Sequence, residues 1–203
     1  MKQYAATIMR FAVAVSVAVA GMSFTSPAAA QPRVQPDHAV SYAEAVPGLE
    51  PPGLGDNARY VDEQGREIDP ATNGLQDGGE KTAAIGCTPV TLPDNPHWST
   101  PDVSGHGQWD KGDCTAATAH VKNCLYEYYT DGTYRRKACS GSVQLKPKSV
   151  SNNRTTARRT CDSTGQLISW RNHVDVDVDG QIDPPGTEYR QANVYCVVTG
   201  PDQ

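Results

Sequence analysis

Short stretches of alternating apolar and polar residues, separated by glycine and proline, run through the second half of the 203-residue chain. The clearest is 116–130, where odd positions are mostly apolar and even positions are polar or tyrosine. Successive side chains of a strand point to opposite faces of a sheet, so the odd positions should face a core. The expected strands are 90–92, 116–130, 133–139, 155–161, 167–170, 173–179 and 190–198. No convincing helix competes, and the pattern predicts an all-β fold, a small antiparallel β-sandwich or barrel.

A β-hairpin turning at Asp131-Gly132 is expected to organise this domain. Asp-Gly suits a two-residue type I′ turn, in which both positions need a positive φ. With that turn, opposing residue numbers sum to 263, so Cys124 faces Cys139 directly. The count from the turn puts this pair at a hydrogen-bonded site, where Cα atoms are about 5.5 Å apart, within reach of a disulfide.

The even face of the same hairpin should carry a basic, aromatic platform. In the expected register Tyr126 lies across from Lys137, and Tyr128 lies across from Arg135. If the odd face is buried, these four side chains are free to bind a partner. Tyrosine and arginine are common interface anchors, so we expect these four residues to form the ligand-binding surface.

Cysteine is confined to the second half of the chain, and an even number of cysteines predicts a disulfide framework if the protein is exported. The six cysteines are Cys87, Cys114, Cys124, Cys139, Cys161 and Cys196. The hairpin makes the 124–139 bond the expected one. The sequence leaves the pairing of the other four open, and we favour 87–114 and 161–196.

Residues 1–30 have the pattern of a signal peptide. Lys2 and Arg10 give a basic start, an apolar run follows over 11–22, and alanines at 28–30 offer a cleavage site. The apolar run is shorter than the roughly 20 residues that a spanning helix needs. We therefore expect a secreted, extracellular protein without a membrane span.

Residues 31–86 differ from the rest in composition. They are rich in proline, glycine and alanine, with ten acids against four bases and no cysteine or tryptophan. Low hydrophobicity with net charge predicts a disordered acidic leader, with one marginal hairpin at 60–68. The domain boundaries expected are thus 1–30, 31–86 and a disulfide-stapled β domain at 87–203.

The stapled domain is nearly neutral, but its charges are segregated. Eight Lys/Arg residues fall within 135–159 without an acid among them, whereas acids cluster within 175–188. A solvated surface explains this, and binding to an anionic polymer is the alternative. Nucleic acid is the least expected partner for an exported protein with a sequence pI near 5.5.

The sharpest chemical pattern is the aspartate repeat over 175–183. Its candidate metal ligands are Asp175, Asp177, Asp179 and Asp183. Alternating oxygen ligands followed by glycine match the first half of a calcium loop, but Gly186 stands where a bidentate glutamate should close the cage. We expect an ordinary strand and turn, with a weak calcium site as the alternative; no other cofactor is indicated.

Several stretches taken together resemble small secreted proteins of actinobacteria for which no activity is known. They are Asp-Asn-Pro-His at 94–97, Ser-Gly-His-Gly-Gln-Trp at 104–109 running into Lys-Gly-Asp-Cys at 111–114, Tyr-Tyr-Thr-Asp-Gly at 128–132, and Ser-Trp-Arg-Asn-His-Val-Asp-Val-Asp at 169–177. The resemblance covers most of 87–198 and none of the leader. It implies export and a single domain, and it transfers no catalytic or binding residues.

Catalysis has no motif to support it. The histidines are scattered, without the spacing of a metalloprotease or a nucleophile elbow. His106 and Asp113 flank Trp109 in an apparent glycine-rich loop that could form a site. Gly-His-Gly followed by tryptophan more often anchors a loop on the core. No catalytic residue is assigned.

We therefore expect a non-enzymatic binding or interaction module, whose partner is an anionic cell-envelope polymer or a glycan. Two other classes stay open: a secreted protease inhibitor and a small hydrolase with an unrecognised site. An inhibitor should offer an exposed loop held by a disulfide, and a hydrolase should show converging acidic and histidine side chains.

Overall fold

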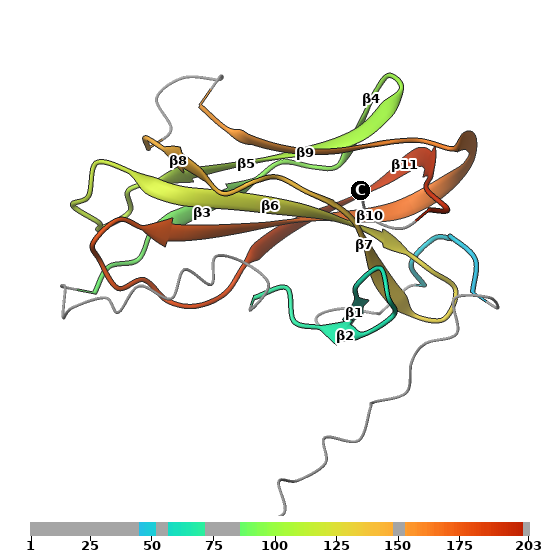
Figure 1. The fold of residues 1–203 in the computed structure, drawn as a ribbon, viewed down its shortest axis with the longest axis horizontal. Helices are drawn as coiled ribbons and strands as arrows, with labels where there is room; N and C mark the ends of the chain where they lie inside the picture. The colour runs from blue at the N-terminus through green and yellow to red at the C-terminus, as the bar shows by residue number, and fades with distance from the viewer. Residues whose placement is uncertain (1–44, 52–56, 72–85, 148–152, 201–203) are drawn as a thin grey trace, which may run out of the picture. The chain divides into compact units, whose positions relative to one another are not determined.

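The alternating stretches form the strands of two stacked β-sheets (Figure 1). The structure, a computed structural model, describes residues 45–51, 57–71, 86–147 and 153–200. Within these ranges the strands are β1 Arg59–Val61, β2 Glu67–Ile68, β3 Val90–Pro93, β4 His97–Ser99, β5 Asp102–Asp110, β6 Ala119–Tyr128, β7 Thr133–Cys139, β8 Val143–Leu145, β9 Thr155–Thr160, β10 Ser163–Val178 and β11 Glu188–Val197. The predicted all-β, disulfide-stapled fold is confirmed.

The two sheets differ in size and in pairing. The larger sheet has seven strands in the order β11-β10-β6-β7-β1-β2, and β8 pairs with β6. Its pairings are antiparallel except that between β1 and β7, which is parallel. In the smaller sheet β5 is central, paired antiparallel with β3, β4 and β9.

The core lies between the sheets, where the predicted odd face of β6 packs. Val121 and Leu125 are fully buried on that face. The two tryptophans of the core donate their indole N–H groups to backbone oxygens. Trp109 Nε1 donates to Leu145 O at 3.1 Å, and Trp170 Nε1 donates to Cys196 O at 3.0 Å. A buried indole N–H left without an acceptor would be costly, so these bonds help to fix both rings.

The hairpin of β6 and β7 has a different turn from the one predicted. Within this turn only Gly132 has a positive φ, of 82°, and Gly132 N donates to Tyr129 O at 3.0 Å. These features are typical of a three-residue loop with a bulge, rather than a two-residue type I′ turn. Near the turn the register is therefore shifted by one residue, and Tyr128 pairs with Tyr134.

A second irregularity restores the predicted register further from the turn. Leu125 pairs with Ala138 while Tyr126 pairs with Arg136, so Lys137 is the extra residue of a bulge. Because of this bulge, Cys124 does face Cys139 as predicted. Their Cα atoms are 4.1 Å apart, as suits a non-hydrogen-bonded pair, so the hydrogen-bonded site predicted for them was wrong.

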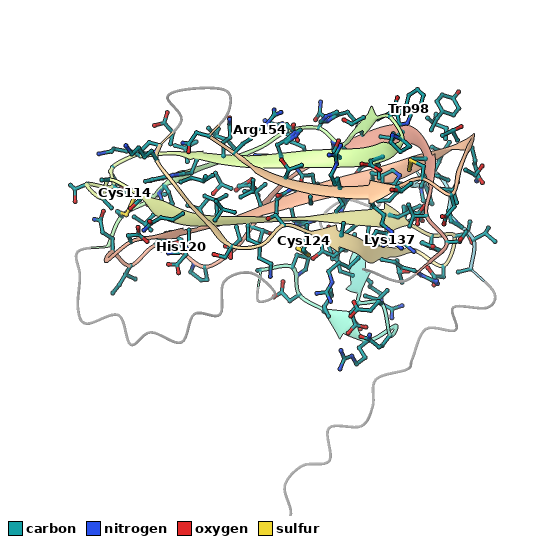
Figure 2. All side chains as sticks on the ribbon, turned by 45° about the horizontal axis from the view of Figure 1, so that its top comes forward. Trp98, Cys114, His120, Cys124, Lys137 and Arg154 are labelled. Carbon is teal, nitrogen blue, oxygen red and sulfur yellow. A yellow bond between two sulfur atoms is a disulfide. The ribbon has the colours of Figure 1, made fainter. Side chains whose placement is uncertain are left out.

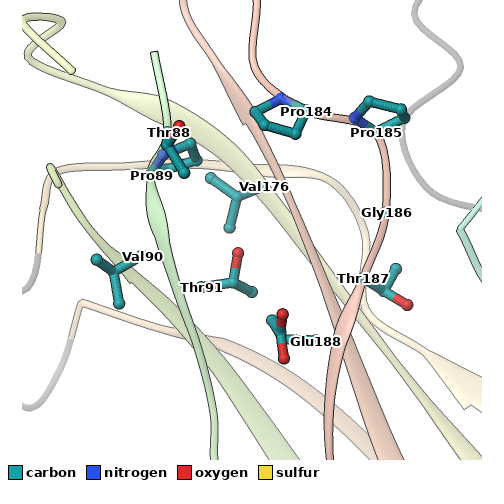
Figure 3. A pocket seen from close by; sticks show the side chains of 10 residues that line it. All are labelled: Thr88, Pro89, Val90, Thr91, Val176, Pro184, Pro185, Gly186, Thr187 and Glu188. Atoms are coloured by element: carbon teal, nitrogen blue, oxygen red, sulfur yellow. The ribbon is translucent and has the colours of Figure 1, made fainter. Parts of the chain in front are cut away.

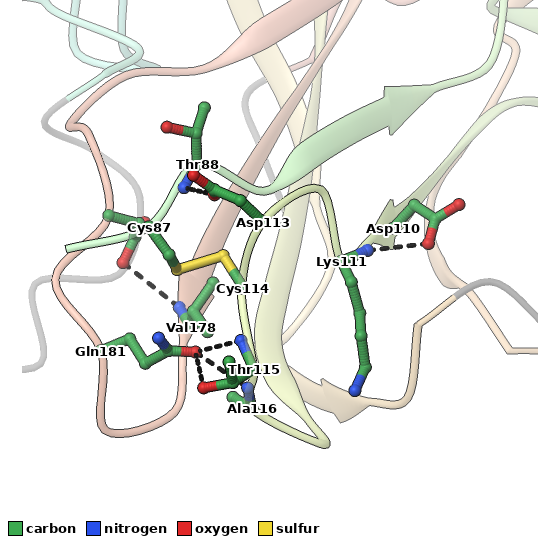
Figure 4. The surroundings of a disulfide bond; sticks show 11 residues. Cys87, Thr88, Asp110, Lys111, Asp113, Cys114, Thr115, Ala116, Val178 and Gln181 are labelled. Carbon is green, nitrogen blue, oxygen red and sulfur yellow. Dashed lines mark hydrogen bonds between the residues drawn. A yellow bond between two sulfur atoms is a disulfide. The ribbon is translucent and has the colours of Figure 1, made fainter. Parts of the chain in front are cut away.

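All three expected disulfides are present: 87–114, 124–139 and 161–196. The first joins the chain before β3 to the turn after β5, where Gln181 Oε1 accepts hydrogen bonds from Thr115 N and Ala116 N (Figure 4). Three disulfides are typical of proteins from oxidising compartments.

Part of the stretch predicted to be a disordered leader belongs to the folded unit. Residues 45–51 and 57–71, which we call the N-terminal strap, pack on the larger sheet. Gly48 N donates to Tyr128 O at 3.1 Å while Gly48 O accepts from Ser169 N, so the strap lies between β6 and β10. The expected boundary at residue 87 is therefore wrong for the strap.

The strap continues as β1, whose Tyr60 pairs with Tyr134 of β7 and stacks on its ring. All described residues lie within one compact unit, Pro36–Gln203. The predicted signal peptide at 1–30 and the remaining parts of 31–86 lie outside the described residues. Among the residues described, no helix has the length and apolar character to cross a membrane.

Candidate functional site

The predicted aromatic platform is buried. Tyr126, Tyr128, Arg135 and Lys137 are each exposed by only 1–2 %. They also lie on different faces, because the shifted register places the tyrosines on the outer face of the larger sheet and the two cations toward the core. The prediction that these four residues form an exposed surface is wrong.

The N-terminal strap covers the outer face of the larger sheet, and a buried arginine of that sheet holds it there. Arg171 of β10 donates to Tyr60 Oη at 2.7 Å, to Glu50 Oε1 at 2.9 Å and to Gln191 Oε1 at 2.9 Å. Its guanidinium also lies 4.3 Å from the ring centre of Tyr134, within the range of cation–π attraction. Two of its partners, Glu50 and Tyr60, belong to the strap, so Arg171 fixes the strap to the sheet.

His173 lies beside Arg171 under the same cover. Its ring nitrogens contact Tyr60 Oη and Thr187 Oγ1, each at 3.0 Å. Burial, with the nearby Arg171 charge as a second cause, lowers the pKa of His173 from 6.5 to about 3. The imidazole is therefore neutral at physiological pH and acts as a packed hydrogen-bonding group.

The inner face carries a second buried ion pair, between Glu127 and Lys137, with 3.5 Å between Oε2 and Nζ. Val198 N donates to Glu127 Oε1 at 2.8 Å, whereas Oε2 has no hydrogen-bond partner among the described residues. Burial raises the pKa of Glu127 to about 7, although Lys137 and Val198 favour the charged form. Burial likewise lowers the pKa of Lys137.

The aspartate repeat forms a strand and turn. Asp175 and Asp177 lie in β10, whose even-numbered valines fill the core. Asp179 accepts a hydrogen bond from Gln144, and Asp183 Oδ1 accepts one from Val178 N at 3.3 Å. In the described part of the chain, none of the four belongs to a group of three ligand atoms within 4.8 Å. The structure does not gather a calcium cage here.

A groove of about 440 Å³ separates β3 from the loop that joins β10 to β11 (Figure 3). Its walls carry Pro89 on one side and Pro184 and Pro185 on the other, together with Thr88, Thr91 and Thr187. Glu188 is its one acidic lining residue. The groove has one charged lining residue, against four in a hollow of the smaller sheet, so it is a weaker candidate than the outer face of that sheet.

That outer face is built by the even positions of β5. Its odd positions face the core, and two of them, Gly105 and Gly107, have no room for a side chain. A Cβ on Gly105 would lie 2.6 Å from Asn172, and one on Gly107 would lie 2.9 Å from Val174, both residues of β10 in the larger sheet. Because successive side chains of a strand alternate between faces, His106, between the two glycines, points to the outer face. The glycine-rich loop predicted here is a strand.

His106 belongs to a cluster with Asp94 and His97 (ligand atoms within 4.8 Å). Asp94 follows β3 directly and His97 begins β4, so both lie on the edge beside β5. Asp94 Oδ2 is 2.6 Å from His106 Nδ1 and 3.9 Å from His97 Nδ1, and the two imidazole rings stack. We call these three residues the histidine–aspartate cluster.

Two asparagines on the larger sheet hold this cluster from behind. Asn172 Nδ2 donates to His106 O at 2.9 Å and lies 3.3 Å from Asp94 Oδ1. Asn172 Oδ1 in turn accepts from Asn123 Nδ2 at 2.9 Å. The same Asp94 oxygen accepts from His106 N at 2.6 Å, so the carboxylate is fixed in position.

A polar hollow of about 480 Å³ lies on the same sheet, where β5 begins and β9 ends. Its lining residues are Asp102, Arg158, Arg159, Thr160 and Asp162. Arg158 Nε is 2.9 Å from Asp102 Oδ2, and Thr160 Oγ1 donates to Asp102 Oδ1 at 2.8 Å. The hollow is within the size range of ligand sites and has several hydrogen-bonding groups.

Two cations of the predicted basic stretch, Arg135 and Lys137, are buried, and half-buried Arg136 contacts Glu63 Oε2 at 2.8 Å. Lys146 is exposed, as is Arg158 on β9, and Arg159 is half-buried. Arg154, just before β9, is also exposed (Figure 2). Trp98, at 55 % exposure, is the large apolar side chain of the neighbouring β4.

No protein-family model matches the chain, and no curated protein or solved structure is significantly similar to it.

Proposed function

We propose that the protein is an exported, non-enzymatic module that binds a glycan in the polar hollow of the smaller sheet. The observation that carries this proposal is the lining of the hollow, in which two carboxylates and two guanidinium groups surround a space of about 480 Å³. Carboxylates accept hydrogen bonds and guanidinium groups donate them, so together they can serve sugar hydroxyls, which do both.

Trp98 offers the second element of a glycan site. An exposed indole presents a flat apolar surface against which a sugar ring can pack. Trp98 pairs with Val103, whose side chain faces the core, so the indole lies on the face of edge strand β4 opposite to Asp102. A chain of sugars held in the hollow would therefore reach this ring by passing round the edge of β4.

The balance of charge favours a glycan over an anionic polymer. Asp102 and Asp162 offset Arg158 and Arg159 within the hollow, so net charge contributes little attraction. Export is supported by the signal-peptide pattern of 1–30 and by three disulfides.

Binding of purified cell-envelope polysaccharides to the mature protein tests the proposal. Hydrogen bonds to charged groups contribute about 1.5–3 kcal/mol each, so an Asp102→Asn/Arg158→Gln double variant should bind at least roughly tenfold more weakly. Trp98→Ala should weaken binding by the loss of stacking. Arg66→Gln removes a similar contact between an exposed arginine and a buried aspartate in the N-terminal strap, and it should bind like the wild type.

Retained affinity in both site variants would place the ligand elsewhere and contradict the proposal. Salt separates the two partner classes, because screening weakens binding of an anionic polymer but hardly affects hydroxyl recognition. A steep loss of binding between low and physiological salt would favour the anionic polymer instead.

A protease inhibitor is the second candidate, favoured by the exposed turn next to the 87–114 disulfide (Figure 4). Lys111 lies exposed in this turn, and its backbone O accepts from Cys114 N at 2.8 Å. Asp113 braces the turn from the other side by accepting a hydrogen bond from Thr88 N. Inhibition of a trypsin-like protease that disappears in Lys111→Ala, while glycan binding is absent, would favour this class.

A further inference from the structure

The histidine–aspartate cluster has the composition of a metal site. It combines two imidazoles with one carboxylate, and the three ligand atoms lie within 4.8 Å of one another. We propose that Asp94, His97 and His106 bind one divalent transition-metal ion of the zinc or copper type. This site goes beyond the proposed glycan function and does not depend on it.

The spacing of the ligand atoms is close to what an ion requires. Zinc binds imidazole nitrogen and carboxylate oxygen at about 2.0–2.2 Å, which separates tetrahedral ligands by roughly 3.3 Å. Asp94 Oδ2 now lies 2.6 Å from His106 Nδ1 and 3.9 Å from His97 Nδ1. One distance must open and the other close by well under an ångström each, which small side-chain rotations achieve.

The surrounding structure fixes two ligands and leaves the third adjustable. Asp94 is fixed by His106 N and Asn172, and Asn172 is itself fixed by Asn123. The side chain of His106 is 11 % exposed, whereas that of His97 is 42 % exposed. His97 Nδ1 lies 2.9 Å from backbone Asn95 O, and it must give up this contact to bind a metal ion. Support of this kind behind metal ligands typically changes metal affinity 10- to 100-fold.

The donor set selects the class of ion. Calcium and magnesium prefer all-oxygen sites, while imidazole suits zinc and copper. Three protein ligands on a solvent-exposed face leave a fourth position for water or for a group from a partner. The cluster therefore fits zinc or copper, and it does not fit calcium.

A matched control lies on the other sheet. His120 Nε2 is 3.6 Å from Asp179 Oδ1, so it forms a similar His–Asp pair. No third ligand joins that pair among the described residues. The other group of three, Cys87, Asp113 and Cys114, has both cysteines in a disulfide, so they cannot supply thiolates.

Calorimetric titration of the metal-free mature protein with Zn²⁺, Cu²⁺ and Ca²⁺ tests the proposal. We expect one equivalent of Zn²⁺ or Cu²⁺ to bind and Ca²⁺ to give no binding. His97→Gln should weaken binding at least tenfold, and His97→Gln/His106→Gln should abolish it. His120→Gln should bind like the wild type, and near-ultraviolet circular dichroism should show that each variant is folded.

Co²⁺ gives a readout that does not depend on how the buried His106 tolerates substitution. Co²⁺ bound by His97 and its neighbours should produce visible absorption bands that Zn²⁺ displaces and that His97→Gln, a change at an exposed residue, removes. Equal affinity in wild type and His97→Gln, or loss of binding in His120→Gln, would overturn the proposal. So would the absence of any Zn²⁺ or Cu²⁺ binding, which would leave the cluster as a brace for the β3–β4 connection.

Discussion

Each face of the larger sheet buries an ion pair, but the two pairs differ in how completely their carboxylates are hydrogen-bonded. On the outer face Arg171 donates to Glu50 Oε1 at 2.9 Å, and Tyr134 Oη donates to the other oxygen of Glu50 at 2.8 Å. On the inner face Glu127 and Lys137 are 3.5 Å apart, and one carboxylate oxygen lacks a hydrogen-bond partner among the described residues.

The difference follows from the chemistry of the two cations. A guanidinium is planar, offers five donors in a fixed arrangement and stacks on aromatic rings, so Arg171 can bond three partners and pack on tyrosines at once. An ammonium is a compact charge, and Lys137 gives its short contacts to Tyr129 Oη and Gly200 O instead. Burial of a charge is tolerated on the outer face, whereas on the inner face it favours the neutral carboxyl.

The two faces should therefore respond to pH with opposite signs. The pKa of Glu127 is raised from 4.5 to about 7, so its contribution to stability is present below pH 4.5 and is lost as the pH rises to 7. The pKa of His173 is lowered from 6.5 to about 3, so its contribution is present above pH 6.5 and is lost as the pH falls to 3. Between pH 4.5 and 6.5 one contribution falls as fast as the other rises, so the two changes in stability with pH cancel.

The largest expected effect comes from His173→Gln. Each pKa unit corresponds to about 1.4 kcal/mol, so the wild type should lose about 5 kcal/mol relative to this variant between pH 6.5 and 3. Urea unfolding at a series of pH values measures the difference. If the difference in unfolding free energy between the two proteins stayed constant across this range, His173 would take up a proton in the folded state as readily as in the unfolded chain.

Arg171→Met tests whether the outer pair depends on its arginine. Removal of one partner leaves Glu50 in a site where its side chain is only 9 % exposed, and the expected loss of unfolding free energy is about 3–5 kcal/mol. Lys137→Met should cost less near neutral pH, because Glu127 can take up a proton. Equal losses in the two variants would contradict the distinction between the faces.

Glu127→Gln should give the smallest of the three effects. The variant should gain about 3 kcal/mol relative to wild type as the pH rises from 4.5 to 7, since the glutamine has no proton to lose. Between pH 4.5 and 6.5 the free energy of unfolding should rise with pH in Glu127→Gln and fall with pH in His173→Gln. Parallel slopes would show that the two groups do not titrate as described.

The sequence predicted the strands whose residues alternate clearly and the disulfide of the hairpin, because these depend on local patterns, but it did not predict β4, β5 or β8. Alternation over 116–130 identified the core face of β6, and an antiparallel hairpin brings Cys124 opposite Cys139 whether the register slips and recovers or never slips. The turn was mistaken because Thr-Asp-Gly-Thr suits both two-residue and three-residue loops. The bulge at Lys137 has no sequence signal that separates it from a regular strand.

The N-terminal strap could not be predicted from its composition. It buries Tyr60 and Val61 within an otherwise acidic and proline-rich stretch, so its average hydrophobicity stays low. The candidate sites were missed for a related reason. His97 and His106 are nine residues apart, and only the pairing of β4 with β5, together with the two glycines, brings them to one face.

The parallel pairing of β1 with β7 also affects how separate copies of the chain meet. Without β1 the backbone of Thr133–Arg135 would form an open sheet edge, and such edges recruit strands from other molecules and promote aggregation. With β1 in place the outermost strand is β2, which is two residues long and carries Glu67 beside Arg59. A short, charged edge is a poor template for another strand, so the strap protects the folded protein from self-association through this sheet edge.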